Sequence, residues 1–516
     1  MACAVQPLRP ALISCFTATY DLLVETIDVH LDEDAEVTDE VDDSYPVNAV
    51  LCRHQRGAAF AFGEMRDTFA PMIKPLAALM VALIAAPVAA AVQLLLPTDL
   101  SAGDPAAVRL EGLPPAARVE MTTEARTDFT NKVATARAVF VADRRGAIDL
   151  GRVAPVEGDY AGVDKAGMFW SARSGRAAVA ADPAAGDVRV IVRVGGQVVA
   201  SGTTRVGPAA AAITLTTVAT FPGSVLARPT GGGRLPLVIV LGGSEGGSYT
   251  ARQIAPLLAA RGFAVLGLPY YSPGYDPTDT IAGLPATFTD IPVDRLEQVH
   301  AWAATRADID ATRIGLWGVS KGGEFAMIAA SRFAWLTAVV GIVPSDVVWE
   351  GWGQPGAKTA SFAVDGEPLP FLHYVGMDAA FARMAKGETV TLREPHAAGR
   401  RAFPAELVTA RVPIERFRGA LLLVGGERDN VWPSADMVRA IAETRTRAGL
   451  ATEVIIGADA GHALGDPGYF PTEESAAGLG GTAAGVAHTR AAAWQATIAL
   501  FDRALKGQAA SARGKP

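Results

Sequence analysis

Apolar runs that alternate with helical segments dominate the second half of the chain, and they restrict its fold more than any other feature. The six runs are residues 237–241, 263–268, 314–317, 338–343, 420–424 and 453–456. Continuous apolar runs flanked by helices are typical of strands buried on both faces, and such strands form parallel sheets. Residues 213–218 and 224–227 precede them and fit an antiparallel entry. Residues 221–507 are therefore predicted to form an α/β domain, with helices on both faces of a mostly parallel sheet.

A serine in a glycine-rich turn follows the third run. Residues 318–322 read Gly-Val-Ser-Lys-Gly, the pattern G-x-S-x-G, between a predicted strand and an apolar helical stretch. The glycines allow a sharp turn in which a Cβ would clash, and this turn holds the Ser320 hydroxyl at the C-terminal edge of the sheet. The N-terminus of the next helix adds partial positive charge where negative charge develops. Ser320 is therefore predicted to be a catalytic nucleophile, and a glycine-rich structural turn is the alternative.

A nucleophilic serine needs a base and a carboxylate that orients the base, and both are found after later runs. His462 lies in a glycine-rich loop directly after the sixth run, and it is the predicted base. Asp429 follows the fifth run and is the preferred acid, with Glu427 and Asp459 as alternatives. The acid would hold the His462 imidazole in the correct tautomer and stabilise its protonated form.

A second glycine-rich loop follows the first run. Residues 242–247 read Gly-Gly-Ser-Glu-Gly-Gly, which lacks the Lys-Ser/Thr of a phosphate-binding P-loop and does not fit G-x-G-x-x-G. In an α/β-hydrolase this loop supplies one backbone N–H of the oxyanion hole, and the residue after the nucleophile supplies the other. The predicted donors are the N–H groups of Ser244 and Lys321, with Gly243 or Glu245 as alternatives for the first. The simpler interpretation of this loop is a plain tight turn.

The part of the chain before the α/β region has the pattern of an all-β domain. Short apolar runs separated by Gly and Pro predict a β-sandwich over residues 94–220. The runs are residues 107–110, 118–122, 138–142, 177–180, 188–194 and 197–202. This stretch shows no nucleophile–base pair, so its predicted role is that of a lid or spacer. Residues 351–412 are rich in Gly, Pro and aromatic residues, and they are predicted to form a small cap insertion in the α/β domain.

The N-terminal region differs in composition from the rest of the chain. Residues 1–71 contain all three cysteines and a dense acidic run, whereas residues 72–91 contain Lys74, a 13-residue apolar stretch and small residues at the end. The second segment is typical of a bacterial secretory signal peptide. We therefore expect Met72 to be the initiator, residues 1–71 to be an over-extended or disordered N-terminus, and residues 508–516 to be a tail.

The expected location of the protein depends on this N-terminal region. With Met72 as the start, the protein would be periplasmic or secreted, and it would keep no stable membrane span after cleavage. An uncleaved segment over residues 76–96 is long enough to cross a membrane once, and a buried helix is a third interpretation. In those cases the protein would be membrane-anchored or cytoplasmic.

Charge and composition exclude several classes of protein. The chain has 46 basic and 54 acidic residues, a net charge of −8 and no basic block, which argues against a nucleic-acid partner. The sequence has no H-E-x-x-H motif, no histidine cluster and no cysteine after residue 52, so no metal site and no cofactor is predicted. Cofactor-free nucleophilic acyl transfer on a small molecule is the chemistry that these residues support.

Five short motifs occur in the β-rich and α/β regions in an order that is specific to one family. They are Gly-Asp-Tyr-Ala-Gly-Val-Asp at 158–164, Gly-Met-Phe-Trp-Ser at 167–171, Pro-Tyr-Tyr at 269–271, Val-Ser-Lys-Gly at 319–322 and Val-Trp-Pro-Ser at 431–434. These motifs resemble those of acyl-CoA thioesterases and bile acid-CoA:amino acid N-acyltransferases. The resemblance implies an N-terminal immunoglobulin-like domain before an α/β-hydrolase domain, and it implies that Ser320, Asp429 and His462 form a catalytic triad.

The same resemblance leads to an expected reaction. The conjugating members of the family use cysteine as nucleophile, whereas this chain has Ser320. We therefore expect a serine hydrolase that cleaves acyl-CoA-type thioesters to a free fatty acid and a thiol through an acyl-serine intermediate. The acyl chain is expected in an apolar cleft between the cap and the β-rich domain. The alternatives are an exported carboxylesterase or dienelactone-hydrolase-like ester hydrolase, an acyl-CoA:amino acid N-acyltransferase, and a non-enzymatic binding module. The sequence predicts no oligomeric state.

Overall fold

The computed structural model describes residues 91–100, 107–126, 132–184, 186–207, 213–353, 358–467, 471–472, 476 and 478–507. All of these residues belong to one compact unit, Ala89–Pro516. The predictions for residues 1–71, for nearly the whole signal segment 72–91 and for the tail 508–516 lie outside the described residues. Within the described residues, no helix is both long and apolar enough to span a membrane.

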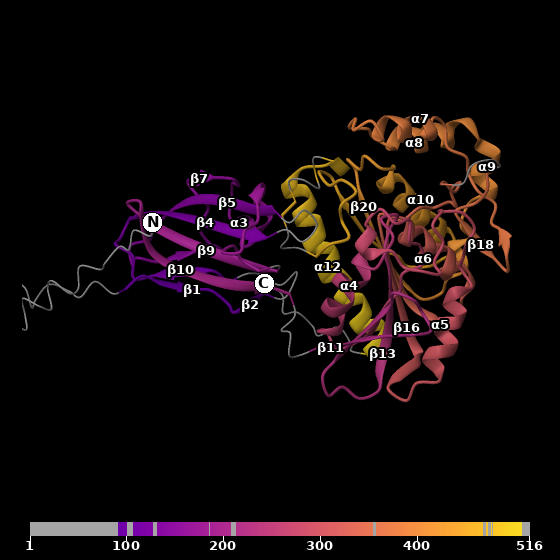
Figure 1. The fold of residues 1–516 in the computed structure, drawn as a ribbon, viewed down its shortest axis with the longest axis horizontal. Coiled ribbons are helices and arrows are strands. Elements are labelled where there is room, and N and C mark those ends of the chain that lie inside the picture. Colours follow the sequence, from indigo (N-terminus) through magenta and orange to yellow (C-terminus); the bar gives the residue numbers. More distant parts are fainter. Residues whose placement is uncertain are drawn as a thin grey trace, which may run out of the picture. The chain divides into compact units, whose positions relative to one another are not determined.

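An eight-stranded sheet forms the centre of the α/β region (Figure 1). In order across the sheet, its strands are β11 (Ile213–Thr217), β12 (Val225–Pro229), β14 (Ala264–Gly267), β13 (Leu235–Leu241), β16 (Ile309–Val319), β17 (Leu336–Ile342), β20 (Ala420–Gly426) and β21 (Glu453–Gly457). The strands from β14 to β21 run parallel, and β12 and β11 are antiparallel at one edge. The predicted mostly parallel sheet with an antiparallel entry is therefore confirmed.

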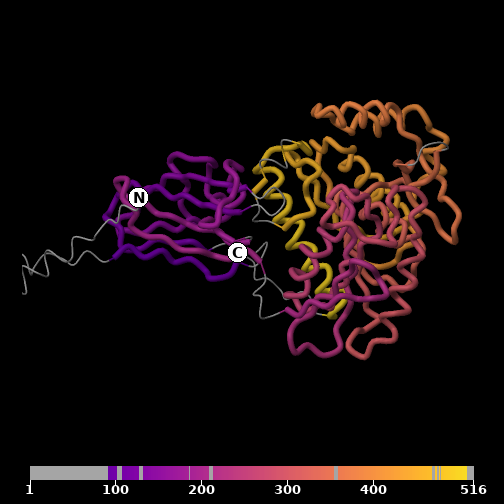
Figure 2. Tube along the Cα trace, in the orientation of Figure 1, coloured from indigo at the N-terminus to yellow at the C-terminus, as the bar shows by residue number. Residues whose placement is uncertain are grey.

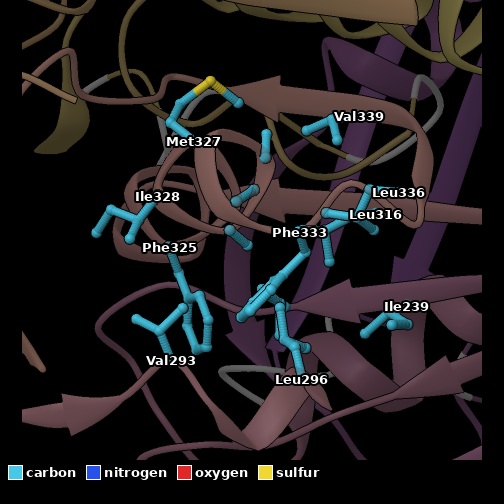
Figure 3. Packing of buried hydrophobic residues seen from close by; sticks show 14 of the residues in the cluster. Ile239, Val293, Leu296, Leu316, Phe325, Met327, Ile328, Phe333, Leu336 and Val339 are labelled. Atoms are coloured by element: carbon cyan, nitrogen blue, oxygen red, sulfur yellow. The ribbon is translucent and has the colours of Figure 1, made fainter. Parts of the chain in front are cut away.

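Helices pack on both faces of this sheet, because neighbouring side chains of a strand point to opposite faces. They are α4 (Tyr249–Ala259), α5 (Arg295–Ala304), α6 (Lys321–Arg332), α10 (Ser434–Arg447) and α12 (Ala483–Lys506). In β13, Leu237, Ile239 and Leu241 belong to one hydrophobic core, and Val238 and Val240 belong to the other. The first core contains side chains of α5, α6 and α10, some of which Figure 3 shows against the strands. The second core contains side chains of α4 and α12.

The predicted cap region, residues 351–412, carries short elements outside the main sheet. They are β18 (Phe362–Val364), β19 (Glu367–Pro368), α7 (Met377–Met384), α8 (Arg393–Ala402) and α9 (Pro404–Thr409). Strand β18 pairs with β19 and with β15 (Ile291–Pro292) in a three-stranded sheet. The short 3₁₀ helices η3 (Pro277–Asp279) and η4 (Ile414–Arg416) lie before and after this region in the chain.

The chain passes through the β-rich region before it enters the α/β region (Figure 2). Its elements are β1 (Gln93–Leu95), β2 (Asp99–Leu100), β3 (Arg109–Glu111), β4 (Arg118–Arg126), β5 (Lys132–Val141), β6 (Ile148–Asp149), β7 (Glu157–Gly158), α3 (Gly167–Trp170), β8 (Arg173–Ala177), β9 (Asp187–Val194) and β10 (Gln197–Val206). One sheet has the order β2-β10-β9-β4-β5-β7 with β8 also paired to β5, and the other has the order β1-β3-β6. The immunoglobulin-like assignment of this region stays a prediction.

Two details of the β-rich region differ from the sequence-based pattern. The predicted strand 177–180 is wrong for most of its length, because β8 ends at Ala177 and a turn follows. The Asp182 carboxylate stabilises this turn by accepting a hydrogen bond from Val179 N at 2.7 Å. Strand β11 pairs with β12 in the eight-stranded sheet, as the predicted antiparallel entry requires, so the α/β region begins before the predicted boundary at residue 220.

A polar contact joins the β-rich region to α12. Asp164 Oδ2 accepts hydrogen bonds from Trp170 Nε1 at 2.8 Å and from His488 Nε2 at 2.7 Å. The Trp170 and His488 rings meet edge to face, and Thr472 N donates to Trp170 O at 3.1 Å. Asp164 and Trp170 belong to two of the five motifs quoted above, so these motifs fasten the β-rich region to the C-terminal helix.

This contact is expected to make the stability of the protein depend on pH. The hydrogen bond to Asp164 raises the pKa of His488 above its ordinary value. Burial acts to raise the pKa of Asp164, but the hydrogen bonds from His488 and Trp170 oppose it, and the net shift is downward. The stabilisation is therefore complete below about pH 6.5 while Asp164 stays ionised, and it is lost as the pH rises through the folded-state pKa of His488.

Thermal unfolding of the wild type and of His488→Gln between about pH 5 and pH 9 tests this expectation. The wild-type Tm should exceed the Tm of the variant most clearly at about pH 5–6, and the difference should disappear towards about pH 9. In an Asp164→Asn background the difference should no longer depend on pH. A difference that grows with pH would contradict the expected role of this contact.

Candidate active site

The predicted nucleophile lies in a sharp turn between β16 and α6. Ser320 has φ 55° and ψ −120°, a conformation that residues with side chains rarely adopt and that surrounding contacts must hold. Its N–H donates to Ile342 O of β17 at 2.9 Å. A Cβ at Gly322 would lie 2.2 Å from Gly242 O, and a Cβ at Gly318 would lie 2.1 Å from Gly322 O. Close backbone approach therefore requires both glycines of the motif, and the strand–turn–helix context is present as predicted.

Ser320, His462 and Asp429 are joined by a chain of hydrogen bonds. Ser320 Oγ lies 2.8 Å from His462 Nε2, and His462 Nδ1 lies 2.8 Å from Asp429 Oδ2. Asp429 Oδ1 accepts hydrogen bonds from Val431 N at 2.8 Å and from Trp432 N at 3.1 Å. Asp429 is fully buried and His462 is 8% exposed. A carboxylate at Nδ1 favours the tautomer that carries its proton there, which leaves Nε2 free to accept the serine proton.

The sheet topology explains why three residues so far apart in the sequence meet. Ser320 follows β16, Asp429 follows β20 and His462 follows β21. These strands are parallel, and only β17 lies between β16 and β20 in the sheet. Because the carboxyl ends of parallel strands meet at one edge of a sheet, the three loops lie side by side.

Glu427 and Asp459, the two alternative candidates for the acid, have partners other than His462. Glu427 accepts hydrogen bonds from Arg439. Asp459 forms an ion pair with Arg428 at 2.8 Å, on the surface of the protein. Of the three carboxylates, Asp429 is the one that the structure places against the His462 imidazole.

Three other histidines of the α/β region contact residues outside the candidate site. His300 stacks on Trp335, and His373 forms a hydrogen bond with Glu406. His396 is buried in the cap region, and this burial lowers the pKa of its imidazole to about 3. Among the described residues, no group of His, Cys, Asp and Glu side chains is arranged as a set of metal ligands.

The glycine-rich loop after β13 lies close to the nucleophile. A Cβ at Gly243 would lie 3.0 Å from Ser320 Cβ. Gly243 N donates to Glu245 Oε1 at 2.9 Å, so its N–H is already engaged. In the described part of the chain the Ser244 N–H has no backbone acceptor. These contacts favour Ser244 over Gly243 as the first oxyanion donor, and Lys321, the first residue of α6, stays the predicted second donor.

Residues that sequence reasoning missed hold this loop in place. Tyr270 Oη donates to Gly242 O at 2.8 Å, and Asp279 Oδ2 accepts a hydrogen bond from Ser248 N at 2.6 Å. Tyr270 belongs to the motif Pro-Tyr-Tyr, which marked it as a residue of interest without showing its contact. Asp279 had no sequence signal, because an isolated Asp in a loop is ordinarily exposed to solvent.

A cavity of about 780 Å³ opens beside Ser320 and His462. Its walls come from the α/β region and from the β-rich region, where Met168 and Phe169 line it. The expected cleft between the cap and the β-rich domain needs correction, because Leu392 is the only described cap residue in its lining. The physical reason is the contact between α3 and α12, which brings the β-rich region next to the catalytic loops.

Fold and site together define the class of the protein. A mostly parallel sheet with helices on both faces, a serine in a strand–turn–helix elbow, and an acid and a histidine after later strands are the features of an α/β-hydrolase. The chain belongs to the acyl-CoA thioester hydrolase and bile acid-CoA:amino acid N-acyltransferase family. Residues 103–205 match the family model "Acyl-CoA thioester hydrolase/BAAT N-terminal region", and residues 293–507 match "BAAT / Acyl-CoA thioester hydrolase C terminal". Residues 223–361 also match the dienelactone hydrolase family.

Individual relatives share about a quarter of their residues with this chain. Acyl-coenzyme A amino acid N-acyltransferase 2 of Rattus norvegicus is 26% identical over 393 residues, which cover 73% of this chain and 87% of the relative. Acyl-coenzyme A thioesterase 1 of the same species is 26% identical over 381 residues, which cover 71% and 84%. A solved structure of a putative dienelactone hydrolase from Klebsiella pneumoniae is similar over 56% of this chain and 98% of its own, with 17% identity and a TM-score of 0.36.

Proposed function

We propose that the protein is a serine hydrolase that cleaves acyl-CoA-type thioesters to a free fatty acid and a thiol. The observation that carries this proposal is the hydrogen-bonded chain Ser320–His462–Asp429 beside a large cavity. Membership of the family and the relatives that are named acyl-coenzyme A thioesterases support the same reaction. Serine at the nucleophile position supports release of the acyl group to water over transfer to an amino acid.

In the acylation half of the reaction, Ser320 Oγ attacks the thioester carbonyl carbon while His462 Nε2 takes the serine proton. Asp429 stabilises the resulting imidazolium through Nδ1. The carbonyl oxygen becomes an oxyanion, and the N–H groups of Ser244 and Lys321 would donate hydrogen bonds to it. When the tetrahedral intermediate collapses, the C–S bond breaks and the leaving thiolate receives the proton from His462.

In the deacylation half, water loses a proton to His462 Nε2 and attacks the acyl-serine carbonyl carbon. The second tetrahedral intermediate collapses with release of the fatty acid, and the proton on His462 returns to Ser320 Oγ. The acyl chain lies in the cavity during both steps, against apolar side chains such as Met168 and Phe169.

Ester hydrolysis is the second candidate function, because residues 223–361 match the dienelactone hydrolase family. The acyl-serine chemistry is the same for both reactions, and the leaving group is an alkoxide instead of a thiolate. Steady-state hydrolysis of palmitoyl-CoA and of p-nitrophenyl palmitate separates the two. We expect kcat/KM for the thioester to exceed that for the ester by about tenfold or more.

A preference for the oxygen ester would overturn the thioesterase proposal. The same reactions are run with glycine or taurine present, and the products are identified by mass spectrometry. We expect free fatty acid as the main product. Formation of mostly glycine or taurine conjugate would instead establish an N-acyltransferase.

The position of the acyl chain leads to a further prediction. Ser174 lines the cavity from β8, so a phenylalanine there would take up space that a long chain needs. For Ser174→Phe we expect kcat/KM for palmitoyl-CoA to fall about tenfold to a hundredfold, and kcat/KM for butyryl-CoA to change less than about threefold. Ser201→Phe, at an exposed position of β10, is the matched control. Equal losses for both chain lengths would show that the chain does not lie along this wall.

A further inference from the structure

A buried lysine directly follows the proposed nucleophile. The side chain of Lys321 is 3% exposed, and the proposed reaction does not use its amine. Lys321 Nζ lies 2.5 Å from Glu324 Oε2, and it donates a hydrogen bond to Ser361 Oγ at 2.8 Å. Glu324 is fully buried in the first turn of α6. Because buried charges are costly even in pairs, an ion pair at this place calls for a specific role.

Aromatic rings and the start of the cap region enclose this ion pair. The ammonium group of Lys321 lies 5.1 Å from the centroid of the Phe288 ring and 5.3 Å from that of the Phe362 ring, distances at which cation–π attraction operates. The other oxygen of Glu324, Oε1, accepts a hydrogen bond from Trp349 N at 3.0 Å. Ser361 Oγ donates in turn to Trp349 O at 2.8 Å. The ion pair therefore ties the first turn of α6 to the chain that follows β17.

We propose that Lys321 and Glu324 are a positioning pair for the oxyanion hole. With its side-chain tip anchored in the protein interior, Lys321 is held so that its own backbone N–H faces the carbonyl oxygen of the substrate. This inference rests on the proposed function, in which that N–H is the second oxyanion donor. Lys321 thus contributes a backbone donor to the reaction and a side chain that fixes the donor in place.

The backbone conformation of the nucleophile explains why such an anchor is needed. The direction of the Lys321 N–H depends on the peptide plane between Ser320 and Lys321, and Ser320 has φ 55° and ψ −120°. A conformation of this kind persists only where surrounding contacts hold it. On the strand side, Ser320 N donates to Ile342 O, and on the helix side the pair of Lys321 and Glu324 holds the first turn. The carbonyl oxygen of this peptide, Ser320 O, accepts a hydrogen bond from Glu324 N at 3.0 Å, so the peptide plane is coupled to the first turn of α6. Without the side-chain pair this turn can shift and carry the Lys321 N–H with it, and a displacement of about 1 Å costs about a hundredfold in rate.

Burial and charge act on the pair in opposite directions. Burial lowers the pKa of the Lys321 ammonium and raises that of the Glu324 carboxyl group, whereas the charge of each partner opposes the shift of the other. Removal of one partner leaves the other buried and unpaired, which destabilises the fold. A test of positioning must therefore separate a loss of stability from a loss of geometry.

The double variant Lys321→Met/Glu324→Leu separates the loss of stability from the loss of geometry. Apolar side chains of similar size usually restore the stability lost with a buried ion pair. We expect its Tm to lie within a few degrees of the wild-type value and its KM for palmitoyl-CoA to change less than about threefold. Its kcat should fall about tenfold to a hundredfold. The milder variant Glu324→Gln keeps an acceptor for Trp349 N, and its kcat should fall about tenfold. Reaction with a fluorophosphonate probe, which phosphonylates an activated serine, should slow in parallel.

A double variant with both wild-type Tm and wild-type kcat would overturn the proposal, because the pair would then only stabilise the fold. If the double variant does not fold, wild-type kcat in Glu324→Gln has the same consequence. The control is Arg400→Met, which loses a partly buried ion pair with Asp346 outside α6 and should keep its kcat. A comparable loss in that variant would also contradict the proposal. The probe needs no thioester, so a wild type that is labelled but does not hydrolyse palmitoyl-CoA refutes the proposed function, while the labelling rates still test the pair.

Discussion

Replacing Ser320 with alanine is expected to reduce kcat for acyl-CoA hydrolysis by about 10⁵-fold to 10⁶-fold. The variant loses the oxygen that becomes acylated, so no acyl-enzyme forms. Binding and the oxyanion donors remain, so a residual rate above that of the uncatalysed reaction is expected. Steady-state kinetics with palmitoyl-CoA measures this loss, and the mass of the protein after a brief reaction shows whether a covalent acyl group is present.

The His462→Ala variant provides the comparison for Ser320→Ala. Residues of a triad act as a unit, so His462→Ala is expected to lose about as much activity, and the double variant should lose little more than either single variant. Losses that multiply would show that the two residues act independently. Unchanged turnover in Ser320→Ala would identify a different nucleophile. Both outcomes would contradict the acyl-serine mechanism.

Replacing Asp429 with asparagine is expected to reduce kcat by about 10⁴-fold. Asp429 is fully buried and accepts the Nδ1–H of His462 at 2.8 Å. The hydrogen bonds from Val431 N and Trp432 N occupy the remaining oxygen of the side chain. The asparagine oxygen would be kept by these two donors, so its NH₂ group would face Nδ1 and would favour the tautomer with the proton on Nε2. In that tautomer His462 cannot accept the proton of Ser320.

The carboxylates Glu427 and Asp459 supply matched controls for this prediction. Glu427 lies in the loop of Asp429, and Asp459 lies in the loop of His462. Both carboxylates are paired with surface arginines. Glu427→Gln and Asp459→Asn are therefore expected to change kcat less than about twofold, since surface ion pairs contribute little. A large loss in either control together with a small loss in Asp429→Asn would assign the acid to another residue.

Much of the α/β region could be predicted from local sequence, and particular residues show why. The run 237–241 is apolar at every position because its side chains enter two cores, as Leu237 and Val238 do. In the run 314–317 the three residues other than Gly315 also enter these cores. The turn at Ser320 could be located because its glycines are required by backbone contacts close to the turn itself. By contrast, the predicted strand 177–180 was wrong because an alanine-rich run has no strong preference for a strand, and a nearby carboxylate stabilises a turn instead.

The sequence by itself determined the order of the candidate catalytic residues along the chain: a serine, an acid and a histidine, each directly after a buried strand. These positions are readable because parallel strands end at a common edge, whatever the details of packing. Only the tertiary structure decided which of three carboxylates meets His462, because the direction of a loop side chain is set by long-range contacts. It also decided that the β-rich region forms a wall of the cavity, whereas Leu392 is the only described cap residue in the lining. Finally, it revealed the contact of Lys321 with Glu324 and Ser361, which depends on a fold that brings Ser361 to a residue far away in the chain.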